Sequence, residues 1–267
     1  MAGKDLGEDL IPAPRSRVIL IGASNVTLGL PVIVDWALRL PGPVEILTAQ
    51  GHGRSYCQQS YVLHRGLPSI LECGLWETLA SRPAAPNTFG VLTDLGNDLL
   101  YGVPVDRVLK SVEDVFQRLK QHSADITFVR PPLARILMLT ERRYRVISQL
   151  MFPGCPVTWD EMQPRIQKLD QDAFALLEKD VARVVVPELD WYGIDPIHIR
   201  RSKRRLAWRS ILGDWPVRDP ADDHRPNWSF TQKLWRAAPA ERTLWKRPTF
   251  QLQPALIFRG GSSLWMY

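Results

Sequence analysis

Arg17–Ser24 reads RVILIGAS, and this stretch sets the architecture that we expect for the chain. Arg17–Ile21 is a short β-branched run that stops at Gly22, as a buried parallel strand does. Apolar residues then recur with a helical period over Thr27–Leu40. A strand that passes through a glycine turn into a helix predicts the first unit of an α/β fold.

The same alternation continues along the chain. Further strands are predicted at Val44–Thr48, Phe89–Leu95, Ile126–Val129 and Val181–Val186. Further helices are predicted at Ser60–Cys73, Val105–Gln121, Met162–Glu178 and Lys203–Leu212. Strands that alternate with helices predict an α/β fold whose mostly parallel sheet is covered on both faces.

Two stretches interrupt this alternation and define the expected domain organisation. We expect an N-terminal tail over residues 1–16 and a main domain over residues 17–212, with an apolar and basic insert at residues 133–160. Residues 213–267 are rich in tryptophan and proline and contain no repeat. We interpret them as an extension that packs on the core, in preference to a separate small domain.

Composition restricts the class of protein. The 267 residues are 45% hydrophobic and 23% charged, as in ordinary globular proteins. The first residues carry no apolar run typical of a secretory signal, and no segment approaches the ~18 apolar residues that span a bilayer. We therefore expect a cytoplasmic protein without a transmembrane segment. Three widely spaced cysteines give no metal-ligand spacing.

The formal net charge of +6 is concentrated late in the chain, most densely in IRRSKRRLAWR at Ile199–Arg209. We interpret this stretch as the solvated face of an amphipathic helix. Arg200, Arg201 and Lys203 also suggest a hypothesis that an anionic substrate is attracted. No zinc-finger spacing or RNA-binding motif accompanies the charge, so nucleic acid is not expected as a partner.

Polar residues follow the predicted strands at the edge where parallel sheets bind ligands. Ser24 follows the first strand, Gly53 the second, Asn97 the third, and Asp195 and His198 the fifth. A serine nucleophile needs a base, and a histidine base needs a carboxylate that holds its tautomer. The sequence therefore predicts Ser24, His198 and Asp195 as catalytic residues, with the backbone N–H groups of Ser24 and Gly53 and the Asn97 amide as oxyanion donors.

Local spacing supports this set. Asp195 and His198 stand three residues apart in DPIH, so one turn can bring the carboxylate to the imidazole Nδ1. The serine block lacks the G-x-S-x-G elbow because Val26 occupies the position of its second glycine. This argues against the classical α/β-hydrolase topology.

These blocks resemble the SGNH hydrolases, also called GDSL-type esterases and lipases. Ser24, Gly53, Asn97 and His198 match the family's four named residues in order and context, although Gly51 is an alternative register for the second. The LGND and D-x-x-H blocks match closely, whereas GAS stands where the family usually has GDS. The resemblance covers residues 17–212 and implies a three-layer α/β/α sandwich of flavodoxin-like arrangement, without metal or organic cofactor.

The resemblance implies hydrolysis of an ester, a thioester or an O-acetyl group on a small or acylated substrate, through an acyl-Ser24 intermediate. Three alternatives stay open: acyl transfer, a non-catalytic member of the fold, and a dinucleotide-binding protein. The last is disfavoured because the glycines do not form G-x-G-x-x-G. Within the insert, Met138 and Met151 are predicted to contact the acyl group, and the alternative is a helix that only covers the sheet.

Overall fold

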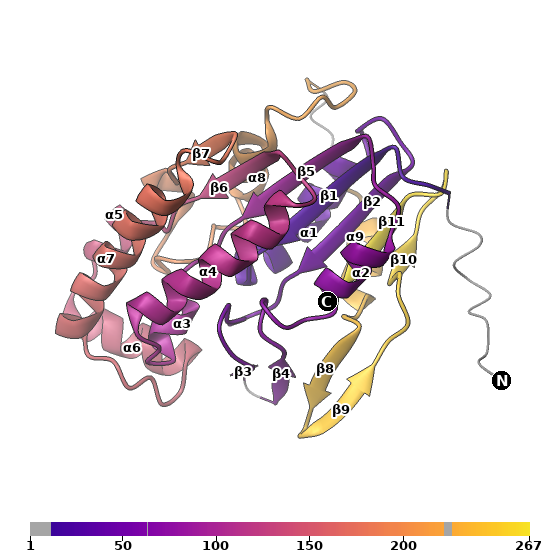
Figure 1. Cartoon of the computed structure of the whole chain (residues 1–267). Helices are drawn as coiled ribbons and strands as arrows, with labels where there is room; N and C mark the ends of the chain where they lie inside the picture. Colours follow the sequence, from indigo (N-terminus) through magenta and orange to yellow (C-terminus); the bar gives the residue numbers. More distant parts are fainter. Residues whose placement is uncertain (1–11, 63, 222–225) are drawn as a thin grey trace.

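A seven-stranded sheet in the order β10-β11-β2-β1-β5-β6-β7 lies at the centre of the molecule (Figure 1). The computed structural model describes residues 12–62, 64–221 and 226–267, so residues 1–11 of the predicted N-terminal tail lie outside it. The strands are β1 (Ser16–Ile21), β2 (Val44–Ala49), β5 (Asn87–Leu92), β6 (Asp125–Val129), β7 (Arg183–Val185), β10 (Leu256–Ile257) and β11 (Ser263–Met266).

The five strands from β2 to β7 are parallel. Their order places β2 on one side of β1, and β5, β6 and β7 on the other, which is the flavodoxin-like arrangement. The predicted α/β fold class is confirmed, and the sheet lies between two layers of helices in a three-layer α/β/α sandwich.

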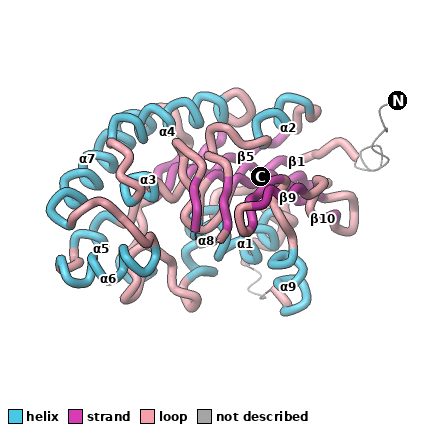
Figure 2. The backbone as a smooth tube through the Cα atoms, turned by 90° about the horizontal axis from the view of Figure 1, so that it is seen from below, coloured by secondary structure: helices cyan, strands magenta, loops and turns pink. Residues whose placement is uncertain are grey.

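Side chains of β1 alternate between two apolar cores, one on each face of the sheet. Ile19 and Ile21 pack with α2 (Leu75–Ser81), α4 (Val105–Lys120) and α7 (Trp159–Leu177). Val18 and Leu20 pack with α1 (Ser24–Ala37), α8 (Arg204–Leu212) and α9 (Trp228–Arg236). Figure 2 shows these two helical layers above and below the strands. Burial on both faces explains why RVILI is apolar throughout instead of alternating.

A second, four-stranded antiparallel sheet replaces one predicted helix. Its strands are β3 (Ser60–Val62), β4 (Arg65–Leu67), β8 (Glu241–Leu244) and β9 (Arg247–Phe250), in that order. The helix predicted over Ser60–Cys73 is therefore wrong. Gly66 and Pro68 disfavour helix there, and the pairing strand β8 comes from a distant part of the sequence.

The segment 213–267 contributes to both sheets. Its strand β11 runs parallel to β2 in the central sheet, and β8 and β9 extend the small sheet. Within the insert, α5 (Leu133–Leu137) and α6 (Glu141–Met151) follow β6 and contact α7. Among the described helices, none has the length and apolar character that crossing a membrane requires.

A buried ion-pair network closes the edge of the sheet where the strands begin. Arg17 and Glu45 face each other in the β1–β2 register, and both are at most 2% exposed. The Glu45 carboxylate accepts from Arg17 Nε and from Arg82 Nε at 2.6 Å each. Arg17 also donates to the Pro83 carbonyl at 2.7 Å. The carboxylate thus neutralises two guanidinium groups that would otherwise repel each other.

We expect Glu45→Ala to lower the free energy of unfolding by about 3–5 kcal/mol, because it leaves buried cations without their anion. Urea denaturation followed by circular dichroism measures the change. Glu113→Ala is the control, since it removes the exposed pair with Lys110 and should leave the midpoint nearly unchanged. Equal effects of the two substitutions would contradict this role of Glu45.

Candidate active site

Ser24 lies where the strand order of the central sheet reverses. Strand β1 ends at Ile21, and Ser24 is the first residue of α1. Because β1 connects to β2 on one side and β5 connects to β6 on the other, the connections leaving β1 and β5 diverge at this point and leave a crevice at the carboxyl edge. Ser24 is 6% exposed, so its hydroxyl sits in a sheltered position.

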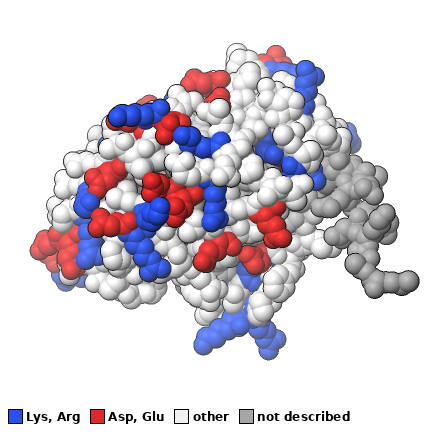
Figure 3. All heavy atoms as spheres, in the orientation of Figure 1, with Lys and Arg blue, Asp and Glu red and all other residues white. Residues whose placement is uncertain are grey.

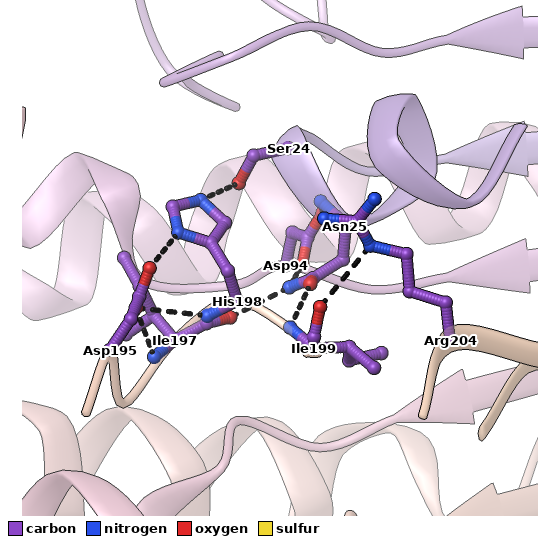
Figure 4. A network of polar contacts seen from close by, with 8 residues as sticks. All are labelled: Ser24, Asn25, Asp94, Asp195, Ile197, His198, Ile199 and Arg204. Carbon is purple, nitrogen blue, oxygen red and sulfur yellow. Dashed lines mark hydrogen bonds and ion pairs between the residues drawn. The ribbon is translucent and has the colours of Figure 1, made fainter. Parts of the chain in front are cut away.

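A continuous hydrogen-bonded chain joins Ser24, His198 and Asp195 (Figure 4). The Ser24 hydroxyl lies 2.8 Å from His198 Nε2, and His198 Nδ1 lies 2.6 Å from Asp195 Oδ2. The second oxygen of Asp195 accepts the backbone N–H groups of Ile197 and His198 at 3.0 and 3.2 Å, which fixes the turn that presents the ring.

Opposing effects act on the Asp195 carboxyl. Burial works to raise its pKa, but the His198 hydrogen bond and charge and the two backbone donors together lower the pKa below its ordinary value. Asp195 is therefore ionised at neutral pH and can stabilise an imidazolium on His198.

Asp94 and Asn25, which the sequence did not single out, hold this arrangement together. The Asp94 carboxylate accepts the backbone N–H groups of Ala23 and Asn25 at 2.7 and 3.0 Å, on either side of Ser24. It also accepts the Asn25 side-chain amide at 2.7 Å. A carboxylate from the end of β5 thus fixes the backbone that carries the serine.

Asn25 then connects the serine turn to the histidine loop. Its amide nitrogen donates to the Ile197 carbonyl at 2.9 Å, and its oxygen accepts from the Ile199 N–H at 2.9 Å. These contacts bracket His198 in the sequence, so one side chain sets the distance between the two loops. The sequence feature that could have indicated Asp94 is its position just after β5. In the structure it adopts a positive φ of 60°, which residues other than glycine seldom adopt.

Asn97 and Gly53, two of the predicted oxyanion donors, each have structural contacts of their own. Asn97 begins α3 (Asn97–Leu100), lines the same cavity as Ser24 and donates one amide hydrogen to the Arg54 carbonyl at 3.0 Å. Gly53 has φ +65°, and a Cβ there would lie 2.3 Å from Val62. This φ and the close approach of Val62 favour glycine here, and the same Cβ would lie 3.5 Å from Phe152 of the cavity wall.

Asp98 joins these two loops. It is fully buried and accepts the hydroxyl of Ser55 and the backbone N–H groups of Tyr56 and Cys57, the latter two at 3.0 and 3.2 Å. Its carboxylate thereby ties the segment after Gly53 to the start of α3. These contacts leave the carboxylate no open access to a ligand.

An apolar cavity of about 100 Å³ extends from Ser24. Ser24 and Asn97 contribute polar groups, while the walls come from the insert, α3 and α7. The apolar lining includes Leu100, Ile136, Leu139, Met151, Phe152 and Met162. Met151 is among these lining residues, whereas Met138 is 60% exposed and lies outside the lining. Met138 falls at the end of the short helix α5, where its side chain faces solvent instead of the cavity.

At the start of α1, a carboxylate already occupies backbone N–H groups that a dinucleotide would need. In a dinucleotide-binding fold the pyrophosphate takes the N–H groups at this helix end, but here Asp94 accepts those of Ala23 and Asn25. In the parts of the chain that the structure describes, no three His, Cys, Asp or Glu side chains gather as metal ligands.

Solved structures similar to this chain include three esterase-type proteins. A member of the lipolytic protein G-D-S-L family from Veillonella parvula DSM 2008 is 12% identical over 75% of this chain and 98% of its own, with a TM-score of 0.46. The psychrotrophic esterase EstA from Pseudoalteromonas sp. is 13% identical over 74% and 97%, with a TM-score of 0.45. The M. smegmatis aryl esterase is 14% identical over 73% and 100%, with a TM-score of 0.47. No family model and no curated protein matches the chain.

The Asp94–Asn25 contact can be tested by exchanging the two side chains. Asn25→Asp places a second carboxylate against Asp94 and should lower the free energy of unfolding by roughly 1–3 kcal/mol. Adding Asp94→Asn restores a donor opposite that carboxylate, so the double variant should recover much of the loss in urea denaturation. Additive losses in the double-mutant cycle would show that the two side chains do not interact.

Proposed function

We propose that this chain is a serine hydrolase that cleaves an ester-type bond through an acyl-Ser24 intermediate. The observation that carries the proposal is the chain of hydrogen bonds from Asp195 through His198 to the Ser24 hydroxyl, at 2.6 and 2.8 Å. Ser24 and His198 lie 174 residues apart, so this contact exists only because the fold brings two strand ends together. The match of Ser24, Gly53, Asn97 and His198 to the SGNH blocks supports the same proposal.

In the first step His198 Nε2 takes the Ser24 proton while the serine oxygen attacks the ester carbonyl carbon. The carbonyl π electrons move onto its oxygen, giving a tetrahedral oxyanion and an imidazolium held by the Asp195 carboxylate. We assign the oxyanion to the Ser24 N–H at the free end of α1, the second amide hydrogen of Asn97 and the Gly53 N–H.

In the second step the oxyanion collapses, the alcohol leaves with the proton from His198, and the acyl group stays on Ser24. Water then repeats the sequence, with His198 as its base, and releases the acid. The apolar cavity beside Ser24 offers the acyl group a site away from solvent, and its size suits a short to medium acyl chain. The alcohol part leaves toward the open side of the crevice.

Ser24→Ala should lower kcat by on the order of 10³-fold or more with the fold intact, because the nucleophile is gone. Turnover of p-nitrophenyl butyrate and labelling by a fluorophosphonate measure this. The unmodified protein should be labelled at Ser24 and the variant should not, which also separates an enzyme from a non-catalytic member of the fold. Near-normal turnover by a folded Ser24→Ala protein would refute the proposal.

Met151→Trp should shift preference toward shorter acyl groups, because the larger ring fills part of the cavity. We expect the kcat/KM ratio of p-nitrophenyl hexanoate to acetate to fall about tenfold or more. Met138→Trp is the matched control, since that residue is 60% exposed and outside the cavity. The same ratio in both variants would mean that the acyl group lies elsewhere.

A further inference from the structure

Arg65 forms no ion pair with an acidic side chain of the residues that the structure describes. It lies on β4, and its guanidinium reaches across to the loop after β2, where Nη2 is 3.6 Å from the Cβ position of Gly51. Its Nε is buried and has no hydrogen-bond partner among the residues that the structure describes. The charged groups that act on it most are Arg242 and Arg54, and together with burial they lower its pKa.

Arg204, the first residue of α8, contacts the loop that carries His198. Its Nε donates to the Ile199 carbonyl at 3.2 Å. The N–H of the same Ile199 donates to Asn25. Figure 4 shows its guanidinium beside Asn25, at the end of the network opposite Asp195. Burial and the charge of Arg201 lower its pKa, and no ion pair to an acidic side chain is found for it within residues 12–62, 64–221 and 226–267.

His52 follows Gly51 in the loop after β2. Partial burial lowers its pKa below 6.5, and the charges of Arg65, His198 and Arg204 add to that effect. Asp94 is the acid that opposes them, yet its carboxylate already accepts three N–H groups. Both arginines and the catalytic histidine therefore act on the His52 ring.

The cations that the sequence singled out behave differently. Lys203 forms an ion pair with the Asp190 carboxylate, and Arg200 donates to the Asp190 carbonyl. Both contacts direct these charges to the loop before Tyr192. We therefore transfer the hypothesis of an anionic substrate to Arg65 and Arg204, which have no acidic partner among the described residues.

We propose that Arg65 and Arg204, together with His52, form an anion-binding subsite beside Ser24, and that the ester cleaved here carries a phosphate or carboxylate on its alcohol part. This inference rests on the proposed esterase function. Guanidinium groups bind both anions through paired N–H donors, and partial desolvation strengthens the attraction. A bound anion would also supply the missing partner of the Arg65 Nε.

The position of the subsite assigns it to the alcohol part of the ester. None of the three residues lines the apolar cavity, which is left for the acyl chain. Positive charge continues outward along the small sheet through Arg242 on β8. At the tip of the β8–β9 hairpin, Lys and Arg side chains gather (Figure 3), and Lys246 and Arg247 are exposed there. This surface attracts anions toward the crevice.

Binding to the Ser24→Ala protein tests the subsite without need of catalysis. Isothermal titration with phenyl phosphate, benzoate and neutral benzamide compares the two anions with an uncharged ring. We expect Arg65→Gln and Arg204→Gln each to weaken binding of at least one anion by roughly tenfold or more, and Arg65→Lys to weaken it less. Lys110→Gln, which removes one positive charge from the exposed face of α4, is the control and should bind as before. Equal binding in all variants, or no binding of either anion, overturns the proposal.

Turnover by the unmodified chain then separates this inference from the proposed function. The substrates are butyrate esters of 4-hydroxybenzoate, 4-hydroxyphenyl phosphate and neutral 4-hydroxybenzamide, and lysophosphatidate in neutral micelles distinguishes a lipid phosphate from a soluble one. Preference for an anionic ester that falls in Arg65→Gln supports both proposals. Turnover of the neutral ester without any anionic preference overturns the subsite alone. Arginine-dependent binding without turnover of any ester overturns the esterase function and leaves the subsite standing.

Discussion

The Asp94 carboxylate is the contact on which the geometry around Ser24 depends. It takes the backbone N–H groups of Ala23 and Asn25 at 2.7 and 3.0 Å and the Asn25 amide at 2.7 Å. Through Asn25 the same constraint reaches the loop that carries His198. Because β1 and β5 are neighbours in the sheet, the carboxylate and the serine turn meet without any long connection. The positive φ of Asp94 is tolerated since these hydrogen bonds determine where its carboxylate must lie.

Buried arginines have different charged neighbours at the two edges of the central sheet. At the edge where strands begin, Glu45 neutralises Arg17 and Arg82, and the network is closed to solvent and ligand. At the edge where strands end, Arg65 and Arg204 are partly buried and face other cations. A closed network contributes to the fold alone, whereas charge left without a partner beside a crevice is what a binding site requires. The contrast explains why burial of an arginine indicates structure in one place and recognition in the other.

Local patterns predicted what is local in the molecule. The apolar run of β1, the helical period of α4 and the short DPIH turn depend on neighbours in sequence, and each was read from a few residues. The helix predicted over Ser60–Cys73 failed because β4 finds its partner in β8, far along the chain. Strand β11 was not predicted for the same reason, because it pairs with β2, which is distant in the sequence. Asp94 was not predicted because its partners are mostly backbone groups, and the direction of a backbone N–H group cannot be inferred from the sequence.

Ala23 and Asp94 together explain how the serine turn does without the aspartate of GDS. Ala23 is fully buried, so a carboxylate on this residue would be enclosed in the core. The backbone N–H groups on each side of Ser24 nevertheless need acceptors, because helix α1 provides none at its first turn. Asp94 supplies them from the neighbouring strand and leaves the Ser24 N–H between two occupied donors. The hydrogen bonds of the two neighbouring residues fix the orientation of the Ser24 N–H. They leave this N–H available to an oxyanion formed at the serine.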